Sequence, residues 1–509
     1  MTQPPSTSPT ATQAAARATT AARGGAGAPV PARGGPTDPS HDANLRRGIL
    51  HTDVSRKVAG FLVVVFLCGI YAVPISQVVL ERVKGDDSVL PDLFRRWPTK
   101  ETIKQFEEDL DKASYPREAV RPRLQYVFTR FGGFGNTKAV IGRDGWLFYQ
   151  PGVAAVGGPG FLDPAILDSR ARAARDDGAP ALHPDPRPAI LAFSAFLATR
   201  GIRLVLFPVP DKAGLQPTEL HGRGRPAAAS AGGEPGETAV GPSPGQNVDQ
   251  PRLERELEGA GVLIFDPTPE RLGAGAPPRF LRQDTHWTPE WMEQVAQALA
   301  AFVTARVPLG PPSAAERATF TAIARPVARV GDVVDMLGLP PGQTLFAPQP
   351  ITVHEVHDAA GALFEPSPDG DVLLLGDSFT NVFTLGQMGW GEAAGLGPQL
   401  ARALGRKVDV IAQNDSGAHA TRQLLWNELT SGDEPAAGEP RRDRLTGKKV
   451  VIWELASREL AVGNWKPLDW SRAAAAQKPT AARPEPPEPH TGRAPAPAGD
   501  VTVAGSVQP

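Results

Sequence analysis

Cysteine is nearly absent from this chain of 509 residues, which contains only Cys68. A single cysteine cannot form a disulfide within the chain, and it cannot build a cysteine-based zinc site. Because Cys68 lies inside a long apolar segment, a catalytic cysteine is not expected either.

The sequence also lacks a strong net charge. Its 53 Lys and Arg residues are balanced by 55 Asp and Glu residues, which gives a net charge of −2. Charges of both signs are mixed along the chain, and no basic stripe with interleaved aromatic residues is present. Nucleic acid is therefore not an expected partner.

Both ends of the chain lack periodic apolar residues. Residues 1–45 are almost entirely Ala, Gly, Pro, Thr, Ser and Arg, and residues 474–509 are rich in Ala, Pro, Glu and Arg. Such segments bury too little apolar surface to offset the entropy of ordering. We expect disorder over 1–57 and 473–509, and the remainder can hold one large domain.

One long run carries no charge, from Val58 to Leu80, between Lys57 and Glu81. At about 1.5 Å per residue it is long enough to cross a hydrocarbon core of roughly 30 Å. A cleaved signal peptide is the competing interpretation, but the run is too long and begins far from the N-terminus. A buried core helix is the other alternative. We expect a transmembrane anchor over 58–80.

The basic residues that flank this run are nearly balanced, so the positive-inside rule does not decide its orientation. We favour an N-terminus inside the cytoplasm, because all residues of chemical interest follow the run. The part of the chain that follows the run also contains no cysteine pair and no cytosolic cofactor motif. The flanking residues are Arg46, Arg47, Arg56 and Lys57 before the run, and Arg82, Lys84, Arg95 and Arg96 after it.

After the run, an amphipathic helix is expected over Thr99 to Lys112, within a juxtamembrane helical region over 81–130. Strand-like and helical segments then alternate over 131–472, which predicts a parallel sheet with helices on both faces, a three-layer α/β domain. The expected strands are Arg203–Val209, Val262–Phe265, Val372–Leu375, Val408–Ala412 and Val450–Leu455. The expected helices are Ala189–Arg200, Pro289–Arg306, Glu392–Leu404 and Ala418–Leu429. Two low-complexity inserts, 170–188 and 221–248, are predicted to be surface loops.

A serine directly follows one expected strand. The apolar residues from Leu373 to Leu375 lead into Gly376, Asp377 and Ser378, and helix-compatible sequence follows. Because sites form at the carboxyl ends of parallel strands, this serine would present its hydroxyl there. Its own N–H, at a helix start, would be available to an oxyanion. Gly-Asp-Ser is also a good helix N-cap sequence, so capping is the alternative.

An aspartate and a histidine lie just before another expected helix. Asp284 and His286 precede Thr288 and Pro289, which form a strong helix start. In an extended stretch, side chains at i and i+2 point the same way, so the carboxylate can accept from one imidazole nitrogen. The other nitrogen is then free to deprotonate a hydroxyl. A structural loop pair is the alternative.

Together, Ser378, His286 and Asp284 supply a nucleophile, a base and a group that orients the base. Their chain order of Asp, His and Ser matches that of subtilisin, where the Asp and His are far apart in sequence. Here they are two residues apart, so subtilisin is not the template.

Further motifs occur in order along the chain. With them, the sequence resembles the AlgJ/AlgX family of polysaccharide O-acetyltransferases, whose SGNH-like domain carries D-x-H-W upstream of a G-D-S-F serine. The resemblance runs from about residue 106 to about residue 463. An anchor in front and no carbohydrate-binding module behind make the layout closer to the AlgJ type. The matching segments are Tyr115–Glu118, Ile141–Tyr149, Pro208–Lys212, Gly331-Asp332 and Ile452–Arg458.

The resemblance implies an SGNH-hydrolase-like fold and a single-pass protein of the bacterial inner membrane with its catalytic domain in the periplasm. It also implies acetylation of an exported, alginate-like polysaccharide through a serine acyl-enzyme, without a cofactor. A membrane-bound O-acyltransferase would supply the acetyl group. Two alternatives remain: a carbohydrate acetylesterase with water as acceptor, and a non-catalytic polysaccharide-binding subunit of an export complex.

Four other residues are weaker candidates for the site. The N–H of Gly417 would complete an oxyanion hole, unless this is an ordinary turn glycine. Arg458 would hold an anionic sugar, or would pair with Glu454 at i,i+4. Tyr149 and Trp287 would line the sugar cleft, or simply pack in the core.

No metal site is predicted. His354 lies in the alternating, strand-like run Ile351–Val356, and His357 directly follows it. Residues three apart in a strand face opposite sides, which argues against shared coordination.

We predict that the segment 58–80 stays uncleaved and places the following domain outside the cytoplasm. Protease added to spheroplasts should digest the C-terminal domain and spare an N-terminal epitope tag. Protection of the domain, or its release by a high-salt wash, would contradict this topology.

Overall fold

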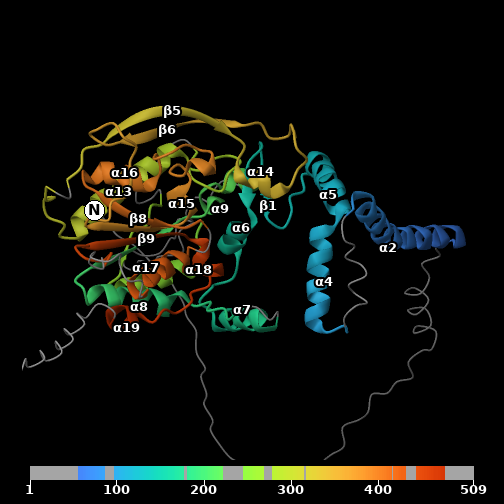
Figure 1. Ribbon diagram of the computed structural model, residues 1–509, viewed down its shortest axis with the longest axis horizontal. Coiled ribbons are helices and arrows are strands. Elements are labelled where there is room, and N and C mark those ends of the chain that lie inside the picture. Colours follow the sequence, from blue (N-terminus) through green and yellow to red (C-terminus); the bar gives the residue numbers. More distant parts are fainter. Residues whose placement is uncertain are drawn as a thin grey trace, which may run out of the picture. The chain divides into compact units, whose positions relative to one another are not determined.

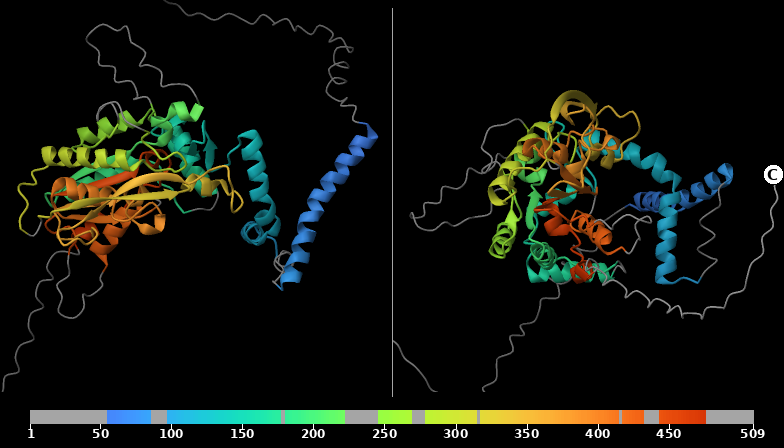
Figure 2. Two further views of the ribbon diagram at one scale, coloured as in Figure 1. Left: turned by 90° about the horizontal axis from the view of Figure 1, so that it is seen from above. Right: turned by 60° about the vertical axis from the view of Figure 1, so that its left-hand side comes forward.

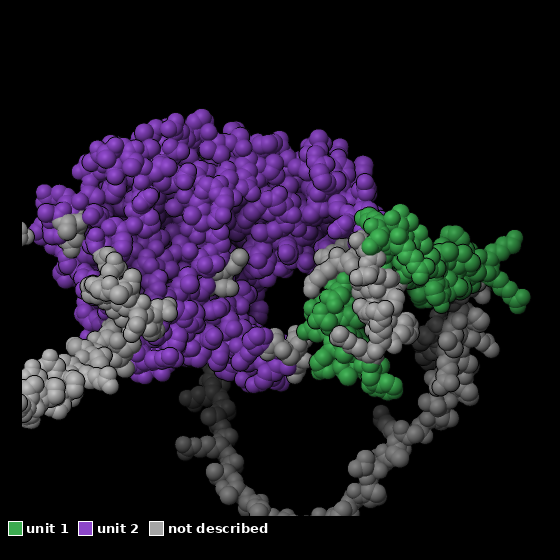
Figure 3. Space-filling model, in the orientation of Figure 1, with its two compact units in different colours: residues 1–113 green, residues 114–509 purple. Residues whose placement is uncertain are grey.

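The computed structural model describes residues 55–85, 97–176, 180–221, 245–268, 278–314, 317–414, 417–431 and 443–475 (Figure 1). The chain divides into two compact units, residues 1–113 and 114–509 (Figure 3). Most of the predicted disordered ends and most of the 221–248 insert lie outside the described residues.

The first unit contains helices α2 (Arg56–Lys84) and α4 (Lys100–Ala113). The hydroxyl of Ser55 caps the start of α2, and Gly85, at φ 79°, ends it. By length and composition, α2 is able to cross a membrane. Helix α4 confirms the amphipathic helix expected over Thr99 to Lys112.

The second unit is built on a five-stranded sheet in the order β4-β3-β9-β7-β8, in which every pairing is parallel. All five expected strands are present within one residue at each end, because each is a short, mostly apolar run of the kind that forms buried parallel strands. The strands are β3 (Arg203–Val209), β4 (Leu263–Ile264), β7 (Val372–Gly376), β8 (Val408–Ala412) and β9 (Val450–Ala456).

Helices cover both faces of this sheet (Figure 1, Figure 2). On β7, Val372 and Leu374 belong to the core under α13 and α16, whereas Leu373 and Leu375 belong to the core under α8 and α17. The alternation of side chains along a strand thus feeds two separate apolar layers. This confirms the predicted three-layer α/β domain. The four helices are α8 (Pro186–Ala198), α13 (Pro289–Arg306), α16 (Leu396–Leu404) and α17 (Ala420–Thr430).

Two antiparallel hairpins were not expected from the sequence. Strands β1 (Ala139–Ile141) and β2 (Leu147–Tyr149) form the first. Strands β5 (Thr321–Arg329) and β6 (Gln349–His357) form the second, and β6 includes the strand-like run that contains both histidines. Helix α14 (Asp332–Leu337) lies between β5 and β6 in the chain.

The predicted loop over 170–188 is wrong for much of its length. Helix α7 (Pro164–Asp176) includes residues 170–176, and α8 begins at Pro186. The segment is rich in Ala and Arg, which are among the best helix formers, so its composition was misread as loop-like. The remaining elements are α5 (Tyr115–Val127), η1 (Phe128–Gly132), α6 (Gln150–Gly157), α9 (Lys212–Leu215), α10 (Pro217–His221), α11 (Gln250–Gly259), α15 (Ser378–Asn381), η2 (Gly386–Met388), α18 (Arg458–Val462) and α19 (Trp470–Ala475).

Candidate active site

Ser378 lies where β7 passes into α15, at the carboxyl end of a central strand. The side chain of Asp377 caps the helix by accepting a hydrogen bond from the N–H of Phe379 at 2.8 Å. The residue that caps the helix is therefore Asp377, which is buried. Ser378 is the first helical residue and is partly exposed. The turn needs glycine at 376, because a Cβ there would lie 2.1 Å from Thr380 Oγ1.

Two buried carboxyl groups fasten this turn to the neighbouring strand β9. Glu454 Oε2 accepts hydrogen bonds from the N–H of Asp377 at 2.9 Å and from Thr380 Oγ1 at 2.7 Å. Asp377 Oδ2 accepts in return from the N–H of Ala456 at 2.8 Å. Complete burial and the negative charge of Asp377 raise the pKa of Glu454 well above its usual range. Both effects favour the protonated form of Glu454.

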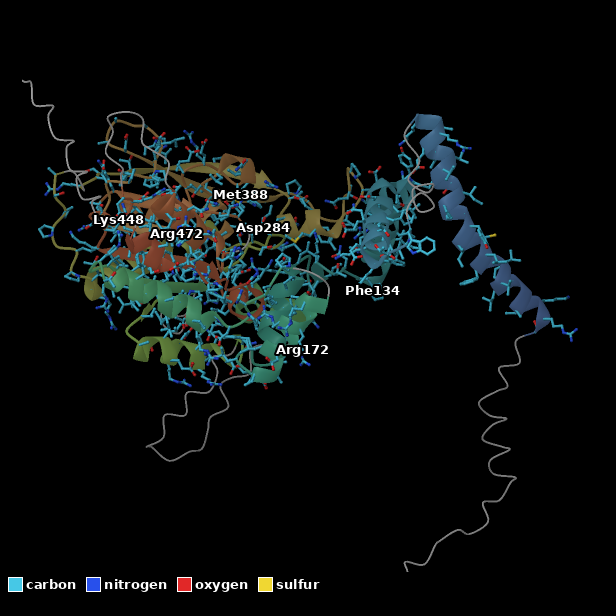
Figure 4. All side chains as sticks on the ribbon, turned by 60° about the horizontal axis from the view of Figure 1, so that its bottom comes forward. Phe134, Arg172, Asp284, Met388, Lys448 and Arg472 are labelled. Atoms are coloured by element: carbon cyan, nitrogen blue, oxygen red, sulfur yellow. The ribbon has the colours of Figure 1, made fainter. Side chains whose placement is uncertain are left out.

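Asp284 and His286 form the pair that their spacing predicts, on the loop before α13 (Asp284 is labelled in Figure 4). Asp284 Oδ1 lies 2.7 Å from His286 Nδ1 and also accepts from the N–H of His286 at 3.0 Å. Asp284 Oδ2 accepts from Trp390 Nε1 at 2.9 Å and from the N–H of Asp332 at 3.0 Å. Burial would raise the pKa of Asp284, but the hydrogen bond and charge of His286 outweigh it and lower that pKa. Asp284 therefore stays ionised.

The imidazole of His286 contacts the serine turn. Its ring packs edge-on against Phe379, the residue after Ser378, with ring centroids 4.9 Å apart. Among the described residues, His286 Nε2 is buried without a hydrogen-bond partner, so no hydrogen bond joins it to Ser378 here. Burial alone would lower the pKa of His286, but the bond to Asp284 and the nearby carboxylates raise it. Because Nδ1 is held by Asp284, Nε2 is the nitrogen available to accept a proton.

Asp332 is a second carboxylate beside the histidine. Its Oδ1 accepts from the N–H of Thr285 at 2.7 Å and from Thr285 Oγ1 at 3.1 Å, and its Oδ2 lies 3.9 Å from His286 Nδ1. Burial and the charge of Asp284 raise the pKa of Asp332 to about 6. The motif Gly331-Asp332 is visible in the sequence, but nothing in its spacing indicated this contact.

Asp284, His286 and Asp332 also lie close enough to hold a metal ion, with their ligand atoms within 4.8 Å of one another. Both oxygens of Asp284, however, already accept hydrogen bonds from protein N–H groups. Nδ1 of His286 is in turn occupied by Asp284. These hydrogen bonds hold the imidazole in one orientation, and within the described part of the chain its Nε2 has no hydrogen-bond partner.

Lys212 positions the loop that carries this pair. Its buried Nζ donates to the carbonyl oxygens of Leu147, Leu281, Arg282 and Asp284 at 2.5, 2.7, 3.0 and 3.0 Å. Burial lowers the pKa of Lys212 to about 7. Four carbonyl acceptors nevertheless favour the ammonium, because a neutral amine offers fewer N–H donors. One side chain thus ties the β1–β2 hairpin to the Asp284 loop.

Arg458 and Tyr149 lie beside the serine turn. The Arg458 guanidinium is 5.2 Å from the ring centroid of Tyr149 and 5.8 Å from that of Phe379. Its ion-pair partner is Asp211, at 3.4 Å. The alternative pair with Glu454 is not formed, because Glu454 points into the turn of Ser378.

The other two weaker candidates occupy buried positions. Gly417 lies against Asp377, where a Cβ would be 3.0 Å from Asp377 Oδ2, so only a glycine brings its backbone this close to the turn. Trp287 is fully buried and packs edge-on against Phe379, with centroids 5.3 Å apart. Trp287 therefore belongs to the core and lines no cleft in this structure.

The parallel sheet with helices on both faces, and the serine turn at the carboxyl end of β7, are those of the SGNH-hydrolase-like class. Residues 139–457 match the family described as "SGNH hydrolase-like domain, acetyltransferase AlgX", and the chain belongs to this family. No curated protein sequence matches it significantly.

Among solved structures, the chain is similar to the O-acetyltransferase domain of Pseudomonas putida AlgJ, with 22% identity over 66% of this chain and 98% of that one, and a TM-score of 0.42. Pseudomonas aeruginosa AlgX gives 18% identity over 71% and 70%, also with a TM-score of 0.42. Bacillus cereus PatB1 gives 13% identity over 64% and 98%, with a TM-score of 0.33.

We predict opposite signatures for the two carboxylates beside His286. Asp284→Asn should lower kcat by roughly 10³- to 10⁴-fold, because it disrupts the orientation and tautomer of the imidazole. Asp332→Asn should retain most of kcat and lower the pKa of His286, since it removes one negative charge. Activity appears as His286 loses its proton, so the acid limb of kcat/KM should move to lower pH by up to about one unit. An unmoved limb, or equal losses in both variants, would contradict these roles.

We predict that Lys212→Met lowers the free energy of unfolding by about 3 kcal/mol or more, because it strands buried carbonyl oxygens. Activity should also fall at temperatures where the variant is still folded. The matched control is Lys449→Met, which removes an ammonium that donates to Leu309 O and Asp371 at the opposite end of the sheet. Chemical denaturation and steady-state kinetics measure both effects. Equal kinetic losses in the two variants would rule out a positioning role for Lys212.

Proposed function

We propose that this protein is a polysaccharide O-acetyltransferase that uses Ser378 as nucleophile, His286 as general base and Asp284 as the residue that orients the base. The observation that carries the proposal is the Asp284–His286 bond of 2.7 Å, with the His286 ring packed against Phe379, the residue after Ser378. Membership of a family described by its acetyltransferase supports the reaction class.

In the first half-reaction, His286 Nε2 takes the proton of Ser378 Oγ as this oxygen attacks the acetyl carbonyl. The tetrahedral oxyanion would accept hydrogen bonds from the N–H groups of Ser378 and Gly417. Collapse expels the donor's leaving group, which takes the proton from His286, and leaves acetyl-Ser378. In the second half, His286 deprotonates a sugar hydroxyl that attacks the ester, and Ser378 regains its proton.

The acceptor would be an exported, alginate-like polysaccharide, and the acetyl group would arrive from a membrane-bound O-acyltransferase. Arg458 and Tyr149, beside the serine turn, would contact an acidic sugar. Helix α2 would anchor the enzyme in the bacterial inner membrane, with the catalytic domain in the periplasm. Such an anchor raises the local concentration of donor and emerging polymer around the site.

We predict that Ser378→Ala abolishes acetyl transfer and leaves the fold intact, because the change is small and at a strand end. His286→Ala should act alike, since members of a triad act as a unit. The assay gives the purified chain an activated acetyl ester, with and without oligosaccharide, and follows acetate and acetylated sugar.

The matched control is Ser367→Ala, at the amino end of the sheet, which should retain full activity. Acetate release that is unaffected by sugar, with no acetylated product, would establish the acetylesterase alternative. Full activity in Ser378→Ala would overturn the proposed nucleophile.

A further inference from the structure

Helices α5 and η1 carry an exposed apolar stripe. Five side chains of this stripe are between 45% and 80% exposed, and Phe131 is the most exposed of them. At about 100° per residue they fall within an arc of roughly 100° on the helix. Phe134, labelled in Figure 4, follows η1 and is also exposed, at 64%. The five residues are Val120, Leu124, Val127, Phe128 and Phe131.

The opposite side of the same helix is polar and is hydrogen-bonded to the loop that follows η1. Thr129 is buried, and its hydroxyl donates to the carbonyl of Phe134 at 3.0 Å. Gln125 Nε2 donates to Thr129 Oγ1 and to the carbonyl of Gly135, both at 3.1 Å. A surface helix of a globular domain normally directs its apolar stripe inward. Here the stripe is exposed instead, so it is available to a partner outside the domain.

Arginines border the stripe on both sides. Arg121, Arg123 and Arg130 are exposed and lie roughly 75° to 105° from the centre of the stripe. The Arg130 guanidinium lies 5.6 Å from the ring centroid of Phe131. Phe and Leu at the centre with Arg at the edges is the composition of helices that lie in a membrane interface. There the apolar side chains enter the acyl region, and the guanidinium groups reach anionic headgroups.

The chain also brings this surface to a bilayer. Helix α2, long and apolar enough to span, ends at Lys84, and only the segment that contains α4 separates it from α5. A tether of this length keeps α5 within reach of the membrane that holds α2. A lipid surface therefore fits the stripe: its acyl region accepts the apolar side chains, its anionic headgroups attract the arginines, and α2 keeps it near.

We propose that the stripe and its three arginines dock the catalytic domain on the anionic surface of the bilayer that α2 crosses. The proposal rests on the anchor in the proposed function and adds a second membrane contact. This contact would hold the serine turn at a fixed height above a membrane-borne acetyl donor.

The test uses the full chain in nanodiscs that contain phosphatidylethanolamine and phosphatidylglycerol, with an environment-sensitive fluorophore on one cysteine. The docking probe is Phe131→Cys in a Cys68→Ser background. Native Cys68, exposed on α2, is the positive control, and Ile323→Cys, 42% exposed on β5, is the matched negative control. Lipids with a spin label in the shallow acyl region should quench the Phe131 and Cys68 probes several-fold more than the Ile323 probe. Discs without anionic lipid should weaken quenching at Phe131 only.

Quenching at Cys68 but not at Phe131 would overturn the docking surface and leave the anchor intact. No quenching at Cys68 would refute the anchor itself. A blue-shifted Phe131 probe that lipid does not quench would assign the stripe to a protein partner, which also overturns the proposal. Acetyl transfer to a soluble sugar is independent of all three results.

Discussion

The carboxylate of Asp284 accepts four hydrogen bonds, and the candidate site depends on them. Two come from His286 and fix its ring. The other two come from Trp390 and from the N–H of Asp332, so that carboxylate also joins two segments remote in sequence. A buried carboxylate would be costly without such donors. With them it remains ionised, orients the imidazole and supports a proton on the ring.

Near Ser378, two buried carboxyl groups lie next to each other. Asp377 and Glu454 lie together in the core, and two ionised carboxylates this close would repel strongly in a low dielectric. The raised pKa of Glu454 favours its protonated form, which relieves the repulsion, and both groups hold the serine turn through hydrogen bonds. Lys212 meets the same problem on the histidine side, where four carbonyl oxygens replace its hydration shell. The two halves of the site are therefore held by buried polar groups on different elements.

The central sheet and the Asp284–His286 contact could be predicted because each depends on a local pattern. Continuous apolar runs indicate buried parallel strands, and i, i+2 spacing on an extended loop brings a carboxylate to an imidazole. Asp332, Trp390 and the acceptors of Lys212 could not, because tertiary packing brings them together from separate segments. The strand-like run of β6 was recognised, but its partner β5 was missed, because the side chains of β5 are largely exposed and show no regular apolar alternation.

The central claim is that Ser378 carries the acetyl group between donor and acceptor. The most direct test is peptide mass spectrometry of the enzyme after brief exposure to an activated acetyl ester, without acceptor sugar. We expect one acetyl group on the peptide that contains Ser378, removed when oligosaccharide is added, and no adduct in His286→Ala. Acetylated sugar formed without any adduct on Ser378, or with the adduct on another residue, would contradict this account.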